Sequence, residues 1–117
     1  MSKIKTIVIK EGMPSIDEAR KKLISEIEIA RNAGVRILKI VHGYGSSGVG
    51  GALRLAIRKS LNYRKKDGQV EIIIYGERFN RNNEDIKPTM KRYPSLNTDS
   101  DYNRNNEGVT IAILKSK

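Results

Sequence analysis

Four short runs of β-branched and apolar residues mark this chain, and helical patterns separate the first three of them. The runs are KTIVIK, VRILKIV, VEIIIY and VTIAIL, at residues 5–10, 35–41, 70–75 and 109–114. Runs of this length and composition are typical of strands. A strand, a helix and a second strand form a right-handed unit in which the two strands are parallel. The order predicts a β-α-β-α-β-β chain.

Residues 15–33 carry the pattern of an amphipathic helix with both ends marked. Ser15 and Glu18 match a capping box, in which each side chain bonds a free backbone amide at the start of the helix. Gly34 suits the left-handed conformation that ends a helix. Apolar residues recur at three- and four-residue spacing at Ile16, Ala19, Leu23, Ile27 and Ala30. We expect this helix to be structural.

A second helix is predicted from about Gly51 to Asn62, followed by a basic turn over residues 63–68. Arg54 and Arg58 lie one turn apart on a face next to the buried one. The buried face consists of Leu53, Ala56, Ile57 and Leu61. Residues 76–108 are polar and rich in asparagine and show no clear period, so we expect a long polar loop there.

The whole chain, residues 1–117, is expected to be a single domain with one modest core. These elements form an α/β fold, a two-layer sandwich with a mixed four-stranded sheet. No apolar run approaches the roughly 18 residues that a membrane span needs. The chain has no cysteine and one histidine, which excludes disulfides, thiolate metal sites and multi-histidine metal centres. We therefore expect a cytoplasmic protein without a bound cofactor or metal.

Positive charge is concentrated in one part of the sequence. The formal net charge is +10, and residues 34–66 contain no acidic residue. Eight basic residues fall in this stretch: Arg36, Lys39, Arg54, Arg58, Lys59, Arg64, Lys65 and Lys66. Solvated lysines alone can account for a basic protein, but this segregation favours an extended polyanion, DNA or RNA, as the partner.

The stretch HGYGSSGVGGALR, residues 42–54, holds half of the ten glycines and the only histidine. It matches G-x-G-x-x-G, but no acidic residue follows about 20 positions later to bind a ribose, and no G-K-[ST] follows either. Glycines before a helix still let backbone amides approach a phosphate, although a tight turn is the alternative. The predicted phosphate contacts are His42, Gly43, Tyr44, Gly45, Ser46, Ser47, Gly48, Arg54, Arg58, Lys65 and Lys66.

His42 ends the second predicted strand and is expected at the carboxyl edge of the sheet, where α/β proteins bind ligands. Its ring has two alternative roles. It can bond a loop carbonyl and hold the turn, or it can act as a phosphate donor or general acid–base.

The segment His42-Gly43-x-Gly45, followed by Leu53-Arg54, resembles the H-G-x-G-x-G-x-L-R signature of Smr (small MutS-related) domains. Residues 105–110, NNEGVT, are similar to the glycine-threonine segment before the last strand of that family. The resemblance implies a fold like the C-terminal domain of translation initiation factor three. It also implies nucleic-acid binding, in many members with DNA nicking or RNA cleavage. Site residues then fall on His42, Gly43, Gly45 and Arg54.

The family's first motif, L-D-L-H-G, falls on residues 8–12, where Ile9 replaces the aspartate and Glu11 replaces the histidine. We therefore expect a nucleic-acid-binding module without strong catalysis, acting alone or with the ribosome or a repair complex. The alternative is an endonuclease that nicks DNA or cleaves RNA with His42 together with Glu11 or a bound divalent metal. A second alternative is a protein that binds a phosphate ligand or small nucleotide.

Three further patterns have weaker implications. Residues 99–103 begin like a calcium loop, but Arg104 stands where glycine is needed, so an acidic turn is expected. Asparagines and an arginine at residues 80–83 suit contacts with nucleic acid or a solvated surface equally well. Aromatic side chains among polar residues suit stacking on unpaired bases: Tyr44, Tyr63, Phe79, Tyr93 and Tyr102.

Overall fold

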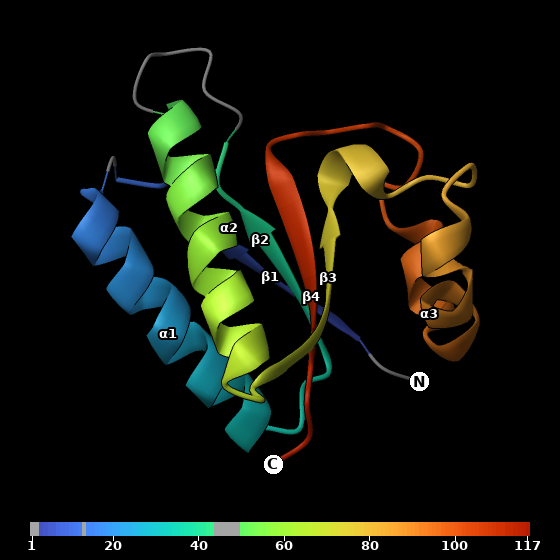
Figure 1. Cartoon of the computed structure of the whole chain (residues 1–117), viewed down its shortest axis with the longest axis horizontal. Helices are drawn as coiled ribbons and strands as arrows, with labels where there is room; N and C mark the ends of the chain where they lie inside the picture. The colour runs from blue at the N-terminus through green and yellow to red at the C-terminus, as the bar shows by residue number, and fades with distance from the viewer. Residues whose placement is uncertain (1–2, 13, 44–49) are drawn as a thin grey trace.

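The computed structural model describes residues 3–12, 14–43 and 50–117. Its strands and α-helices follow the predicted order, with one additional short helix before the last strand (Figure 1). They are β1 (Ile4–Val8), α1 (Ile16–Asn32), β2 (Ile37–Val41), α2 (Gly50–Lys66), β3 (Val70–Tyr75), α3 (Lys87–Arg92) and β4 (Val109–Leu114). Three 3₁₀-helices are η1 (Gly76–Arg78), η2 (Glu84–Ile86) and η3 (Pro94–Thr98). The predicted α/β fold class is confirmed.

The four strands form one mixed sheet in the order β1-β2-β4-β3. β1 is parallel to β2, as predicted, and β4 is antiparallel to both β2 and β3. The carboxyl ends of β1, β2 and β3 therefore lie at the same edge of the sheet as the amino end of β4. We call this edge the carboxyl edge; it is uppermost in Figure 1.

Helix α1 has the predicted start and end. Ser15 and Glu18 form the capping box, with the Ser15 hydroxyl 3.1 Å from the Glu18 amide and the Glu18 carboxylate 2.9 Å from the Ser15 amide. Ala33 caps the other end and Gly34 follows with φ +76°. The buried face of α1 is Ala19, Leu23, Ile27 and Ala30. These side chains pack with α2 on one face of the sheet.

Helix α2 is one turn longer than predicted. The expected basic turn after Asn62 is wrong, because Tyr63, Arg64, Lys65 and Lys66 continue the helix. These residues tolerate a helix, and the chain leaves it only near Gly68, whose φ is +84°. The predicted buried residues Leu53, Ala56, Ile57 and Leu61 do face the core.

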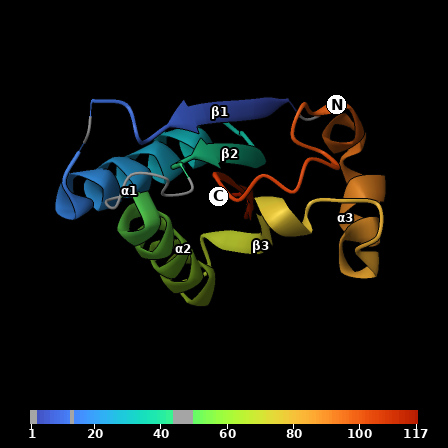
Figure 2. The ribbon, with the colours of Figure 1, turned by 90° about the horizontal axis from the view of Figure 1, so that it is seen from above.

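The segment between β3 and β4 covers the other face of the sheet, opposite α1 and α2 (Figure 2). It was expected to be a polar loop, but it contains η1, η2, α3 and η3. Its apolar side chains fall at irregular spacing because the helices are short, so no single period marks them. They pack on the sheet as a second core cluster whose members from this segment are Phe79, Ile86, Met90, Tyr93 and Leu96. Phe79 and Tyr93 are therefore buried and do not form the expected stacking surface.

A buried ion cluster fixes this segment to β2. Lys39 is 6% exposed, its Nζ lies 2.9 Å from Asp99 Oδ1, and it also pairs with Asp101. Burial alone would lower the pKa of Lys39, but the hydrogen bonds that it donates to Asp101 and Asp99 raise the pKa above its ordinary value. The expected acidic turn thus serves as a counter-ion for Lys39. Within the described ranges no helix is both long and apolar enough to cross a membrane.

Candidate functional site

The turn after β2 is joined to the start of β4 at the carboxyl edge. The amides of His42 and Gly43 both donate to the carbonyl of Gly108, each at 3.0 Å. Gly43 has φ +81°, a conformation that side chains rarely adopt. His42 and Gly43 are thus held by the residue that precedes β4, and the described structure resumes at Gly50, where α2 begins.

The ring of His42 is fully buried and engaged at both nitrogens. Nδ1 lies 2.7 Å from the carbonyl oxygen of Gly43, and Nε2 lies 2.8 Å from the hydroxyl of Thr110. A carbonyl only accepts, so Nδ1 carries the proton, and Nε2 of the neutral ring accepts from Thr110. Burial, with the positive charges of Arg58 and Arg54, lowers the pKa of His42 to about 4. The ring is therefore neutral at pH 7, and its contact with Gly43 is the arrangement expected of a residue that holds the turn.

Arg58 extends this contact into a buried network of His42, Thr110, Arg58 and Glu77. Its Nε donates to the Thr110 hydroxyl at 3.1 Å, and its two terminal nitrogens donate to the Glu77 carboxylate at 2.8 and 2.7 Å. Its guanidinium also lies 4.1 Å from the centre of the Tyr75 ring. Arg58 is only 7% exposed and its donors are occupied. The structure thus places this predicted phosphate contact in the interior, where it supports the turn.

Glu77 balances the charge of Arg58 inside the network. Burial would raise the pKa of Glu77, but the hydrogen bonds from Arg58 keep it below its ordinary value. The two side chains therefore form a charged pair at neutral pH, and this part of the edge contributes little net charge.

Arg54, another predicted contact, lies nearer the solvent in the second turn of α2. Its side chain is 23% exposed and pairs with Glu107 at 3.5 Å. Glu107 is itself 56% exposed, and such a surface pair contributes little to stability. Arg54 can therefore exchange this partner for a phosphate at small cost.

Two lysines complete the edge, Lys10 just after β1 and Lys22 in α1, and neither was predicted as a site residue. A Cβ built on Gly43 would lie 3.5 Å from Cδ of Lys10, so the exposed Lys10 lies against the turn. Lys22 reaches from α1 to donate to the carbonyl of Val8 at 3.2 Å. The parallel register of β1 and β2, in which Val8 faces Val41, is the signal that could have placed Lys10 beside Gly43.

Other predicted site residues lie apart or outside the described structure. Glu11 is exposed and forms no side-chain hydrogen bond or ion pair with the described residues, whereas His42 is buried, so the two are not brought into contact. Lys65 and Lys66 are exposed at the far end of α2, about 22 Å along the helix from its start. No metal-binding group of three histidine or carboxylate side chains forms among the described residues. The predicted contacts Tyr44, Gly45, Ser46, Ser47 and Gly48 lie outside the described residues.

Comparison with known proteins shows the family to which the chain belongs. Residues 11–73, more than half of the chain, match the Smr domain family, and they include His42, Gly43, Arg54 and Arg58. The chain belongs to the Smr family. The structure is similar to the Smr domain of Thermus thermophilus MutS2, with a TM-score of 0.59, 23% sequence identity, and coverage of 95% of this chain and 98% of that one. No curated protein matches the sequence. Smr domains bind nucleic acid, and some are endonucleases.

The Smr match and the structural similarity cover different extents of this chain. The family match ends at Ile73, before the network partners Glu77 and Thr110. The similarity in fold covers 95% of this chain and so extends beyond Ile73 into the segment between β3 and β4. The resemblance expected from the glycine-rich turn is confirmed at the level of family and fold.

Proposed function

We propose that this Smr domain binds DNA or RNA along its carboxyl edge, through the phosphate backbone and without strong catalysis. The observation that carries the proposal is the placement of Lys10 against Gly43, where β2 leads into the glycine-rich stretch before α2. The amino end of a helix carries free amides and partial positive charge, which favour an anion. The first turn of α2 contains no acidic residue that would oppose it.

The charges around this turn favour a polyanion. Lys10, Lys22 and Arg54 lie at the edge, while the Glu77 carboxylate is already paired with Arg58. Phosphate contacts give affinity that does not depend on sequence, and the net charge of +10 attracts the nucleic acid at longer range.

The surroundings of His42 support binding rather than cleavage. A general acid–base must exchange its proton with the substrate and works best with a pKa near the operating pH. His42 is buried, donates to Gly43, accepts from Thr110 and has a pKa of about 4. We infer that it shapes the turn which receives the phosphate.

The test measures affinity for a labelled duplex and a labelled single strand at several salt concentrations. With about three phosphate contacts, the slope of log K against log salt on duplex DNA is expected near −2 to −3. Changing Lys10 and Arg54 together to glutamine removes two contacts and should bring the slope to about −1. Divalent metal is added to parallel samples so that cleavage is read from the same material.

The matched control changes Lys3 and Lys115 to glutamine, which removes the same charge from the opposite edge of the sheet. Both side chains are exposed and lie before β1 and after β4. This variant should keep the wild-type slope. An equal reduction of the salt slope in the two double variants would contradict a site at the carboxyl edge. Metal-dependent cleavage that His42→Ala abolishes would establish the endonuclease instead.

A further inference from the structure

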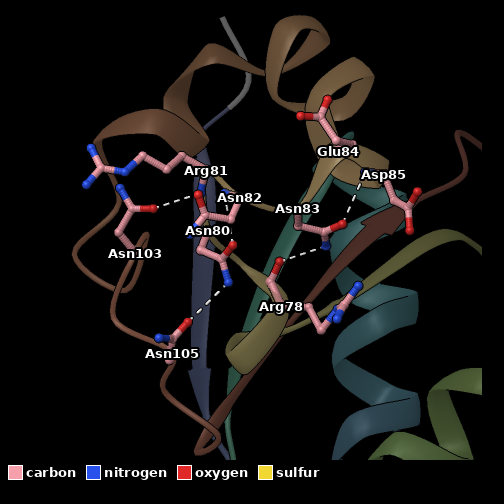
Figure 3. Close-up of a pocket in the computed structure, with 9 residues that line it drawn as sticks. All are labelled: Arg78, Asn80, Arg81, Asn82, Asn83, Glu84, Asp85, Asn103 and Asn105. Atoms are coloured by element: carbon pink, nitrogen blue, oxygen red, sulfur yellow. Dashed lines mark hydrogen bonds between the residues drawn. The ribbon is translucent and has the colours of Figure 1, made fainter.

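A polar cavity of about 540 Å³ lies beyond β3, in a part of the chain that follows the family match (Figure 3). Its volume is within the range of small-molecule sites. It is formed by two stretches, residues 78–85 after β3 and residues 103–105 before β4, and every lining side chain is polar or charged. The lining residues are Arg78, Asn80, Arg81, Asn82, Asn83, Glu84, Asp85, Asn103 and Asn105.

Asparagine side chains hold the two stretches together. The amide of Asn80 donates to Oδ1 of Asn105 at 3.1 Å, and Oδ1 of Asn103 accepts from the backbone of Arg81 at 2.8 Å. Asn103 and Asn105 have φ of 67° and 52°, a left-handed conformation that asparagine adopts more readily than most residues. Asn83 caps η2 by accepting from the amide of Asp85. The walls of the cavity are therefore fixed by the chain itself.

Several polar groups of the lining remain without a partner among the described residues. No hydrogen bond or ion pair in the described ranges uses the guanidinium of Arg78 or Arg81, or the side chain of Asn82. The side-chain nitrogens of Asn103 and Asn105 are also unused, since only their oxygens accept bonds. The cavity thus offers cations and amide donors together with the carboxylates of its acidic residues.

This mixture suits a nucleobase better than a bare phosphate. Asparagine amides pair with base edges, and carboxylates accept from the amino groups of bases. An arginine can stack on a base plane or bond the adjoining phosphate. A free phosphate would meet the arginines but also the repulsion of Asp85, whereas Glu84 is paired with Lys87 at 3.0 Å.

The cavity adjoins the proposed phosphate-binding edge. Arg78 follows Glu77, the partner of Arg58, and Asn105 lies two residues before Glu107, the partner of Arg54. Figure 1 shows the segments after β3 and before β4 at the same end of the sheet as the turn after β2. A strand bound at Gly43 can therefore continue toward the cavity.

We propose that this cavity receives one unpaired nucleobase of the bound strand between Arg78 and Arg81, whose side chains point to opposite sides of the lining asparagines (Figure 3). The inference rests on the proposed function and adds to it a preference for unpaired over paired strands, because base edges are accessible only when unpaired. The remaining contacts of the strand are the phosphate contacts at Lys10 and Arg54.

The experiment compares a labelled single strand of about ten nucleotides, a length within known site sizes, with an abasic strand of equal length and charge. The wild-type protein should bind the strand with bases about 5- to 10-fold more tightly, as expected when one base is held. Arg78→Gln with Arg81→Gln should bind the two strands equally, and the variant with Lys3 and Lys115 changed to glutamine should keep the preference.

Asn82→Ala is the second variant, because the Asn82 side chain makes no hydrogen bond with the described residues, so the variant should keep the fold. It should reduce the base preference without changing the salt slope. Side-chain amide signals of Asn103 and Asn105 should shift with a nucleoside monophosphate and not with inorganic phosphate. Equal wild-type affinity for the two strands, with the salt slope retained, would overturn the cavity proposal and leave the proposed function standing. If the wild-type protein bound neither strand, both the cavity proposal and the proposed function would be overturned.

Discussion

The imidazole of His42 has its proton fixed by two neighbours, Gly43 and Thr110. This was not evident from the sequence. The turn itself could be located from HGYG and the residues after it, but Thr110 lies 68 residues away along the chain. The ring is buried because β4 pairs with β2, and no local sequence pattern predicts that pairing.

The buried His42 predicts a pH-dependent stability. Its pKa is 6.5 in the unfolded chain and about 4 in the folded one, so the unfolded state binds more protons between these values. The free energy of unfolding should therefore fall as the pH falls through this window, by about 2 kcal/mol from pH 7 to pH 5. Urea unfolding at the two pH values measures this difference.

The control for that measurement is His42→Gln, whose stability should stay nearly flat from pH 7 to pH 5. Glu77 and Asp101 have lowered pKa values and so titrate below this range. Because the chain has one histidine, its NMR signals are unambiguous. A ring that titrates near pH 6.5 in the folded protein would contradict the buried neutral form.

Thr110 is predicted to matter through its hydroxyl. Thr110→Val keeps the shape but leaves His42 Nε2 and Arg58 Nε buried without this partner, so it should lower the free energy of unfolding by about 2–3 kcal/mol. Thr110→Ser retains the hydroxyl and should cost less, since only a methyl group is lost. Thermal or urea unfolding of both variants tests this, and equal losses would show that packing rather than hydrogen bonding is responsible.

At the scale of elements, the junction of β3 and η1 depends on the absence of a side chain at Gly76. A Cβ there would lie 1.8 Å from the carbonyl oxygen of Asn106 and 2.8 Å from Val109. Gly76→Ala should therefore destabilise the protein by about 3 kcal/mol or more, because backbone must move. Gly43→Ala is the comparison: among the described residues its Cβ meets Lys10 alone, at 3.5 Å, so backbone strain of about 1–2 kcal/mol is expected. Unfolding experiments that rank the two variants in the opposite order would contradict this assignment.

The ion cluster on β2 gives a second prediction at this scale. Lys39→Met leaves Asp99 and Asp101 without their buried cation and should cost about 3–5 kcal/mol of unfolding free energy. Adding Asp99→Asn and Asp101→Asn to Lys39→Met removes the unpaired charge and should recover part of that loss. If the triple variant is less stable than Lys39→Met alone, hydrogen bonding and not charge is the dominant contribution.

Local signals predicted some elements well and others poorly for a physical reason. The start of α1 is encoded within four residues by Ser15 and Glu18, and strands β3 and β4 have the predicted bounds. The helices after β3 could not be predicted, because each spans three to six residues, too few to show a hydrophobic period. The conformation of this segment depends on contacts with the sheet, since Phe79 belongs to the second core cluster together with residues of β3 and β4.

Over the whole molecule, basic residues at the two ends of α2 are far apart. Lys65 and Lys66 lie about 22 Å along the helix from its start. We therefore expect Lys65→Gln with Lys66→Gln to leave the affinity for a short strand nearly unchanged and to weaken binding of a long duplex, with the salt slope reduced by about 1–2. Anisotropy titrations with both lengths measure this. If the variant lost as much affinity for the short strand as for the long duplex, these lysines would belong to the same binding site as Lys10 and Arg54.

The position of β4 also determines when the sheet can assemble. Among the described residues β4 is the last strand, and it lies between β2 and β3 and is the one strand that pairs with β3. During synthesis from the amino terminus, β1, α1 and β2 can associate early. The backbone hydrogen bonds of β3 with β4 can form only after residue 114 has left the ribosome. The buried network is also incomplete until then, because Thr110 belongs to β4 and its hydroxyl joins His42 to Arg58, the partner of Glu77. The carboxyl edge is therefore completed together with the fold and not before it.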